Sequence, residues 1–222
     1  NTSAQTDSTA WPVSEQYALN VLDEFITDRV RHYQTERDFP DLAATSQLSA
    51  YLNIGILSIR QCLQALFREQ QGYFHLDNAG QQCWLDELLW REFYQHLLFD
   101  FPKLSKHLPF KSNTLQIEWR EAPADLHAWQ QGQTGIPIVD AGMRQLLATG
   151  WMHNRVRMIV AMFLCKNLLI DWRLGEAWFM QHLIDGDLAA NNGGWQWCAS
   201  TGTDAAPYFR VFNPISQSQK FD

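Results

Sequence analysis

The sequence has few cysteines and no close pair of them. Cys62, Cys83, Cys165 and Cys198 are scattered along 222 residues, which excludes zinc-finger and redox-motif spacings and favours a reduced compartment over a disulfide framework. Charged residues are also scarce, at 18%, and 17 basic against 24 acidic side chains give a net charge of −7. No overall positive field therefore attracts a polyanion, and any nucleic-acid site must be a local patch.

Long apolar runs and phosphate-binding motifs are missing as well. The run Met158–Cys165 is interrupted by Lys166 and Asn167, well short of the roughly 18 residues that a membrane span needs. No Gly-x-Gly-x-x-Gly follows a strand pattern and no Gly-Lys-Ser/Thr occurs, which excludes Rossmann and P-loop nucleotide sites. No secretion signal is visible, and no second His or Cys lies at metal spacing from His153. We expect a soluble, cytoplasmic protein without a metal.

Apolar residues recur every three or four positions along most of the chain, as in amphipathic helices. Pro123 and Pro137 suit the first turns of helices, and Ser58 suits the N-cap of a helix over residues 59–71. Glycines suited to helix ends are Gly72, Gly132 and Gly150. No two alternating runs are joined by a hairpin turn. The sequence predicts an all-α domain over residues 11–222, preceded by a polar linker remnant at residues 1–10.

Basic residues are concentrated late in the chain. Residues 1–50 have a net charge of −5, whereas residues 144–173 contain five basic side chains against Asp171, a net charge of +4. On this pattern alone a solvated helix face is a better interpretation than a DNA-binding patch.

Three segments combine polar and aromatic residues. In Asp185–Trp197, two carboxylates, two amides and three glycines precede two indoles, which suits a polar heterocycle as well as a plain glycine-rich connection. In Trp84–Tyr94, Glu87 and Arg91 share a helical stripe, and the pattern favours an i,i+4 ion pair. In the segment 149–158, a helix starting near His153 would place Asn154, Arg157 and Met158 on one face and Arg155 elsewhere.

Together, and in this order, the segments Thr45–Ser49, Trp84–Tyr94, Gly150–Arg155 and Asp185–Trp197 resemble the flavin domain of the class I photolyases that act on cyclobutane pyrimidine dimers. The resemblance covers almost all of residues 11–222. It implies an all-α, helical FAD-binding domain that is C-terminally incomplete. From the resemblance we expect the family's N-terminal antenna domain and final C-terminal helices to be absent from the chain, and therefore no antenna folate or deazaflavin in it.

The resemblance implies a lyase, a deoxyribodipyrimidine photolyase, in which excited reduced FAD passes an electron to a pyrimidine dimer in damaged DNA. We expect a monomer. Asn191 favours this function over a cryptochrome-like blue-light receptor, because plant and animal cryptochromes commonly carry Asp and Cys there. Asn154 and Met158 stand where enzymes for (6-4) lesions carry His. A catalytically incomplete fragment is the other alternative.

The resemblance also implies roles for individual residues. Catalytic roles fall to Glu87, which stabilises the dimer radical anion, to Asn191 beside flavin N5, and to an electron-transfer chain of Trp195, Trp172 and Trp119. The expected FAD contacts are Tyr33, Thr45, Ser46, Gln47, Leu48, Ser49, Trp84, Arg157, Asp185, Gly186, Asp187 and Asn191. The expected DNA contacts are Arg37, Glu87, Trp90, Arg91, Tyr94, Asn154, Arg155, Met158, Trp197 and Gln217.

Overall fold

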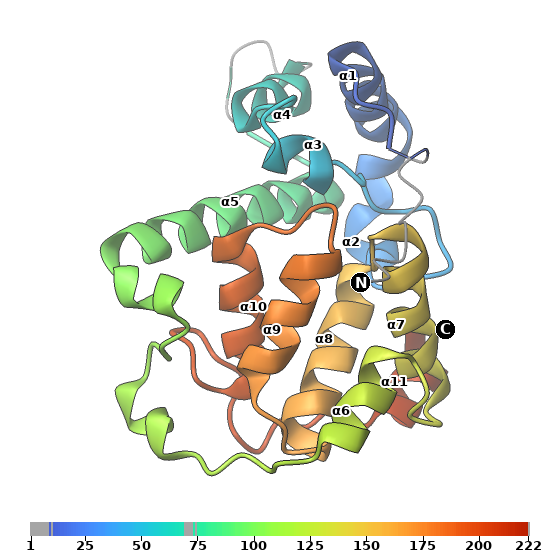
Figure 1. Ribbon diagram of the computed structural model, residues 1–222. Helices are drawn as coiled ribbons and strands as arrows, with labels where there is room; N and C mark the ends of the chain where they lie inside the picture. Colours follow the sequence, from blue (N-terminus) through green and yellow to red (C-terminus); the bar gives the residue numbers. More distant parts are fainter. Residues whose placement is uncertain (1–8, 10, 69–72, 74, 222) are drawn as a thin grey trace. The chain divides into compact units, whose positions relative to one another are not determined.

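The protein is helical throughout the part of the chain that a computed structural model describes, which is residues 9, 11–68, 73 and 75–221 (Figure 1). No strand occurs among these residues, so the all-α prediction is confirmed. The described residues divide into two compact units, an N-terminal unit up to Phe93 and a C-terminal unit from Tyr94 onward. The predicted linker, apart from Thr9, lies outside the described residues.

The N-terminal unit is built from short helices around one apolar core. The core contains Phe25, Leu48, Cys62 and Trp84. Helix α1 continues into a π-helical turn and a 3-10 turn before α2 begins. The elements are α1 (Glu15–Glu24), the π turn Phe25–Arg29, the 3-10 turn Val30–His32, α2 (Tyr33–Glu36), α3 (Ser49–Asn53), α4 (Ile59–Leu66) and the first part of α5 (Ala79–Asp100).

Helix α4 shows where the sequence prediction was right and where it was wrong. Ser58 caps the helix as predicted, since its hydroxyl accepts from the Gln61 N–H at 3.3 Å and Gln61 Oε1 accepts from the Ser58 N–H at 2.8 Å. The helix ends at Leu66 and not at residue 71, because Phe67 leaves the helical conformation with φ −96° and ψ 9°. Gly72, the predicted helix end, lies outside the described residues.

In the C-terminal unit α8, α9 and α10 pack side by side (Figure 1). Pro123 and Pro137 occupy first turns, and Gly150 closes α7 with φ 70°, all as predicted. Gly132, with φ 62°, follows the end of α6 as predicted. The elements are the end of α5, the 3-10 turns Pro102–Lys106 and Ser112–Gln116, α6 (Pro123–Gln130), α7 (Pro137–Thr149), α8 (Asn154–Met162), the π turn Phe163–Asn167, α9 (Trp172–His182), α10 (Leu188–Ala199) and α11 (Pro214–Phe221).

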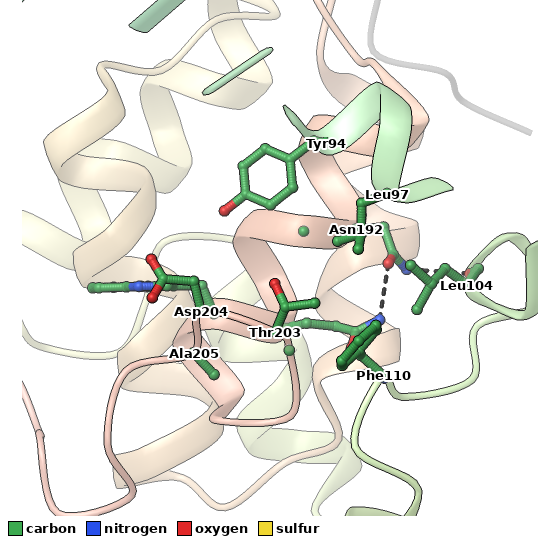
Figure 2. A pocket seen from close by; sticks show the side chains of 12 residues that line it. Tyr94, Leu97, Leu104, Phe110, Asn192, Thr203, Asp204 and Ala205 are labelled. Carbon is green, nitrogen blue, oxygen red and sulfur yellow. Dashed lines mark hydrogen bonds between the residues drawn. The ribbon is translucent and has the colours of Figure 1, made fainter. Parts of the chain in front are cut away.

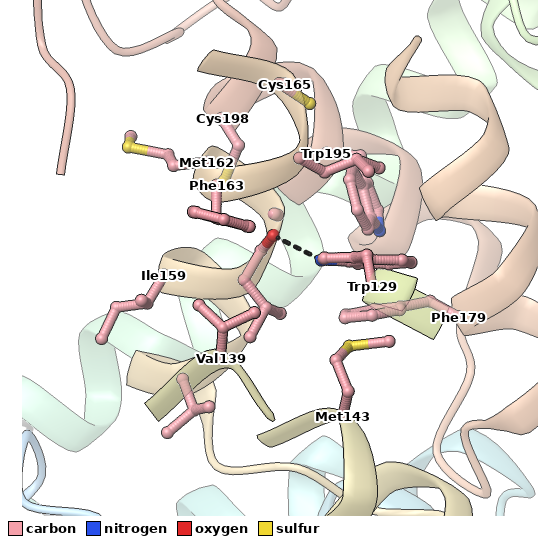
Figure 3. Packing of buried hydrophobic residues seen from close by; sticks show 14 of the residues in the cluster. Trp129, Val139, Met143, Ile159, Met162, Phe163, Cys165, Phe179, Trp195 and Cys198 are labelled. Carbon is pink, nitrogen blue, oxygen red and sulfur yellow. Dashed lines mark hydrogen bonds between the residues drawn. The ribbon is translucent and has the colours of Figure 1, made fainter. Parts of the chain in front are cut away.

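The core of the C-terminal unit is dense with aromatic rings (Figure 3). Trp129 is fully buried, its indole N–H donates to the Val160 carbonyl at 3.0 Å, and its ring stacks on Phe179 with a 13° interplanar angle. Trp195 meets both rings edge-on, with centroids 6.0 Å from Trp129 and 5.0 Å from Phe179. This core fixes the side of α10 that carries Trp195. Within the described part of the chain, no helix is long and apolar enough to cross a membrane.

Candidate functional site

Helix α10 carries the polar cluster that the sequence singled out. Asp187 caps it, accepting from the Ala190 N–H at 2.8 Å through one oxygen and from Gln95 Nε2 at 2.7 Å through the other. The segment is therefore a capped helix from Leu188 and not a loose connection, although Gly193 and Gly194 lie inside it. The cap orients the first turn of α10 toward α8.

A cavity of about 160 Å³ lies between α8 and α10, and we call it the α8–α10 pocket. Asn154, Arg157 and Met158 line it together, which confirms the predicted shared face of α8, and Arg155 is not among the lining residues. A Cβ built on Gly194 would have no atom within 4 Å, so the glycine leaves open space in the pocket wall. The full lining is Asn154, Arg157, Met158, Ala161, Phe179, Leu183, Asp185, Gly186, Asp187, Ala190, Asn191, Gly194, Trp195 and Cys198.

A buried ion pair closes one end of the pocket. Arg157 Nη2 donates to both oxygens of Asp185, at 3.1 and 2.9 Å, and Arg157 Nε donates to the Met152 carbonyl at 2.7 Å. The Asp185 side chain is only 3% exposed and that of Arg157 is 24% exposed. Removing either partner would leave a charge in a poorly solvated place, so the pair fixes the geometry of this wall.

Asn191 presents a hydrogen-bond acceptor to the pocket. Its Nδ2 donates to the main-chain carbonyl of Glu176 at 3.0 Å. Only the amide nitrogen of a carboxamide can donate to a carbonyl, so the orientation of the group is fixed and Oδ1 is left for another donor. The α8–α10 pocket is therefore suited to a ligand with an N–H at this position.

A second, much smaller cavity of about 10 Å³, room for one water molecule, lies on the other side of α10 (Figure 2). Asn192 and Gln196 line it and are both 2% exposed. Asn192 Nδ2 donates to Glu176 Oε1 at 2.8 Å, and Gln196 Nε2 donates to Asn192 Oδ1 at 2.9 Å. The sequence analysis missed Glu176. A signal for it was present, since Glu176 is an acidic residue on the otherwise apolar face of α9 formed by Trp172, Gly175 and Phe179.

The three predicted electron-transfer indoles belong to one core. Trp172 and Trp195 are 1% and 3% exposed, and Trp119 packs partly buried against the same cluster. Trp195 also lines the α8–α10 pocket. Phe179 and Trp129 both meet the Trp195 ring edge-on (Figure 3), and the sequence analysis gave a role to neither of them.

In the N-terminal unit, Glu87 has a long-range partner. Arg37 Nη1 donates to Glu87 Oε1 at 2.5 Å and to Cys83 Sγ at 3.2 Å, and the guanidinium lies 5.3 Å from the Tyr33 ring centroid. The pattern had favoured an ion pair between Glu87 and Arg91, and the structure instead pairs Glu87 with a residue 50 positions away. Burial raises the pKa of Tyr33 above its ordinary value, so this cluster holds a neutral phenol beside the ion pair.

Thr45–Ser49, a predicted FAD-binding segment, forms an irregular turn that leads into α3. The helix begins at Ser49, and its N-cap residue Leu48 makes no side-chain capping hydrogen bond. Gln47 is in the left-handed region with φ 51°. Thr45 and Ser46 are half-buried, and the Thr45 carbonyl accepts from Arg29 at 3.3 Å.

The predicted DNA contacts differ in their surroundings. Trp90 is 42% exposed and meets Phe93 edge-on at 5.4 Å. Arg155 lies 4.6 Å from the Phe221 ring centroid. Gln217 has a buried Oε1 with no hydrogen-bond partner among the described residues, so that atom does not face solvent.

Tyr94 packs against Gly193, where a Cβ would overlap its ring, and Trp197 meets Phe212 at 6.4 Å. The predicted site residues are divided between the two units. Those in the N-terminal unit are Tyr33, Arg37, Thr45–Ser49, Trp84, Glu87, Trp90 and Arg91. No group of three or more potential metal ligands occurs among the residues that the structure describes.

Comparison with known proteins gives consistent matches. The family model described as the FAD binding domain of DNA photolyase matches residues 84–222. The deoxyribodipyrimidine photo-lyase of Escherichia coli K12 is 58% identical over 97% of the chain. Among solved structures, a class III photolyase from Agrobacterium tumefaciens superposes with a TM-score of 0.90 at 46% identity over 97% of the chain. A cryptochrome from Synechocystis has a TM-score of 0.84 at 38% identity over 96%.

The chain spans less than half of these relatives, 45% of the E. coli protein and 44% of each solved structure. The matched family model nevertheless covers more than half of the chain, including both α8 and α10 and the pocket between them. The all-helical fold, the α8–α10 pocket and these matches together place the chain in the family of photolyase FAD-binding domains.

Proposed function

We propose that the protein binds FAD and repairs cyclobutane pyrimidine dimers in DNA with light. The observation that carries this proposal is the α8–α10 pocket, in which a fixed amide acceptor, a buried ion pair and an indole surround open space left by Gly194. These are the features of a site for a flat, polar heterocycle. The relatives named as photolyases support the reaction.

The residues of the pocket fit a part of FAD. A volume of about 160 Å³ is below the roughly 300–1,000 Å³ of pockets that hold drug-sized ligands, so it suits one ring system and not a whole dinucleotide. Asn191 Oδ1 would accept an N–H of that ring, and Arg157 with Asp185 would hold its polar edge. Tyr33, Thr45–Ser49 and Trp84 are the proposed contacts from the N-terminal unit.

The chain's own residues position and shield the reacting groups. When bound, reduced FAD supplies the electron that light drives into the dimer. Phe179, Leu183 and Trp195 exclude water from the pocket, which strengthens the polar contacts of Asn191 and Asp185. We propose that Trp195, Trp172 and Trp119 carry electrons inward to reduce oxidised cofactor, and no acid–base pair is needed.

Recognition of the lesion is assigned to the aromatic and charged residues of both units. Trp90 offers an exposed indole on which a pyrimidine can stack, worth roughly 1–3 kcal/mol per base. Glu87, oriented by Arg37 at 2.5 Å, can accept hydrogen bonds from a pyrimidine edge. The pairing turns Arg37 toward Glu87, so its main role is to orient that carboxylate, and Arg155 is the better candidate for a phosphate contact.

A blue-light receptor is the second candidate, because the Synechocystis cryptochrome superposes nearly as well as the photolyase. The two functions differ in turnover. Reconstitute the chain with FAD, reduce the flavin, and follow a dimer-containing oligonucleotide in blue light and in darkness. Dimer loss confined to the light supports the proposed enzyme. A flavin-loaded chain that leaves the dimer intact contradicts repair by this chain and favours the receptor or a catalytically incomplete fragment. A chain that acquires no flavin absorption contradicts FAD binding, on which both candidates depend.

A further inference from the structure

A buried carboxylate, Glu176, connects α9 to two successive residues of α10. Its main-chain carbonyl accepts from Asn191 Nδ2 at 3.0 Å, and its Oε1 accepts from Asn192 Nδ2 at 2.8 Å. Glu176 is 0% exposed. Its side chain and main chain therefore set the register of the two helices at the residue that faces the α8–α10 pocket.

The other carboxylate oxygen of Glu176 is held from outside the helix pair. His107 Nδ1 lies 2.7 Å from Oε2, and the His107 side chain is 52% exposed while that of Glu176 is fully buried. A buried carboxylate needs donors on both oxygens, because an unsatisfied charged oxygen costs more than an ordinary lost hydrogen bond. His107 is the donor that reaches this oxygen from the solvent side.

The backbone at His107 is arranged to make that contact. The residue follows the 3-10 turn Pro102–Lys106 in the left-handed region, with φ 56° and ψ 27°, a conformation that non-glycine residues seldom adopt. The turn beyond it is tied to α10, since Gln196 Oε1 accepts from the Phe110 N–H at 2.8 Å and Gln196 Nε2 donates to the Leu108 carbonyl at 3.3 Å. His107 thus lies between the 3-10 turn and a segment that is hydrogen-bonded to α10, as expected where backbone strain supports a specific contact.

We propose that His107 is a positioning residue for the FAD pocket, which acts through Glu176 to fix the carboxamide of Asn191. His107 touches neither pocket nor ligand. It donates a hydrogen bond to the Glu176 carboxylate, whose other oxygen accepts from Asn192. The Glu176 main-chain carbonyl accepts from Asn191, which then presents Oδ1 in one orientation. The inference rests on the proposed function for its ligand, but its structural part concerns the chain without FAD.

Two substitutions separate the hydrogen bond from the backbone strain. His107→Asn keeps a donor close to the position of Nδ1 and tolerates the left-handed conformation. His107→Gly relieves the strain and removes the donor. Lys106→Gly, one residue earlier in the same turn and exposed, is the matched control for added backbone freedom.

The first measurement needs no cofactor. The side-chain amide signal of Asn191, assigned by its loss in Asn191→Asp, is recorded by NMR in each variant. We expect it to be unchanged in His107→Asn and Lys106→Gly, and shifted and broadened in His107→Gly. His107→Gly should add nothing further in a Glu176→Ala background, because that background already lacks the carboxylate that His107 contacts. An unchanged signal in His107→Gly, or an equal change in His107→Asn, overturns the inference.

The second measurement is the dissociation constant for FAD. We expect roughly tenfold weaker binding in His107→Gly, as for loss of a hydrogen bond to a charged group, and less than twofold in His107→Asn. Failure of the wild-type chain to bind FAD contradicts the proposed function and leaves the amide test of His107 intact. Equal affinities for wild type and His107→Gly overturn the role in the FAD pocket while the proposed function stands.

Discussion

The two units of the chain bury different kinds of side chain. Among the described residues, the N-terminal unit buries one polar side chain, Gln81, whereas the C-terminal unit buries seven, including Asp140, Glu176, Asp185 and Asn192. Both have apolar cores of ordinary type. Buried polar groups are costly unless each finds partners, and in the C-terminal unit hydrogen bonds hold Asp140, Glu176, Asp185 and Asn192 in fixed directions.

The N-terminal unit places its polar site nearer to solvent. The side chains of Arg37 and Glu87 are 22% and 32% exposed, and they pair beside Tyr33. Burial disfavours the charged form of Arg37, yet Tyr33 and Glu87 raise its pKa above the ordinary value. A half-buried pair of this kind can exchange its partner for a ligand more easily than the Arg157–Asp185 pair can. The contrast predicts which changes damage the fold and which damage recognition.

The largest expected difference is in thiol reactivity. Burial raises the pKa of Cys198 and of Cys62 to about 12 from an ordinary 9.0, and raises that of Cys165 as well. A shift of three units lowers the thiolate fraction about 1,000-fold below pH 9, and the thiolate is the reactive form. At pH 8 only the half-exposed Cys83 should be alkylated in the native protein, as peptide mapping can show.

The pH dependence of this protection follows from the same shifts. The three buried thiols stay neutral in the folded chain while they ionise in the unfolded chain above pH 9. Cys62 and Cys198 therefore contribute their full stabilisation to the folded chain below pH 9 and lose it as pH rises toward about 12, and that of Cys165 is likewise lost only above pH 9. Rapid native labelling of Cys165 or Cys198 at pH 8 would mean that the C-terminal core opens far more readily than its packing implies.

Arg157→Met tests the buried ion pair of the C-terminal unit. It should cost about 3–5 kcal/mol in the free energy of unfolding, because Asp185 keeps its charge in a desolvated position without its guanidinium. Arg68→Met in the N-terminal unit is the matched control. Arg68 pairs with Asp23 at 2.6 Å, but both side chains are more than half exposed, and such pairs contribute about 0–1 kcal/mol. Equal losses in urea unfolding would remove the distinction between the units.

Gly175→Ala tests the packing of α9 against Trp195. A Cβ at Gly175 would overlap the indole ring and lie 2.7 Å from Leu164 Cδ2. Overpacking of this kind costs about 1–3 kcal/mol, and the displaced indole should change the tryptophan fluorescence. Gly194→Ala meets no atom and lies inside α10, so it should raise the free energy of unfolding by about 0.5–1 kcal/mol, while FAD binding weakens. A well-folded Gly175→Ala with unaltered fluorescence would contradict the close contact.

The sequence predicted the elements of this fold better than it predicted their polar contacts. Local signals, such as Pro137 in a first turn and Gly150 at a helix end, depend on a few neighbouring residues and were confirmed. The partners of Glu87 and Glu176 lie 50 and 69 residues away. No local pattern contains such a pairing, so the local rule chose Arg91 for Glu87 and overlooked Glu176.

Ser58→Ala gives the smallest effect and tests a contact that the sequence did predict. The Ser58 hydroxyl and the Gln61 side chain satisfy each other's main-chain N–H groups at the start of α4, and loss of such a cap costs about 1 kcal/mol. Ser14 caps α1 in the same unit with a single bond of 3.3 Å to Tyr17 N, so Ser14→Ala should cost less. Urea unfolding of both variants measures the difference. If Ser14→Ala costs as much as Ser58→Ala, the reciprocal bond from Gln61 adds nothing. If Ser58→Ala costs as much as Arg157→Met, the N-terminal unit depends on its helix ends as strongly as the C-terminal unit depends on its buried ion pair, and the contrast between the units fails.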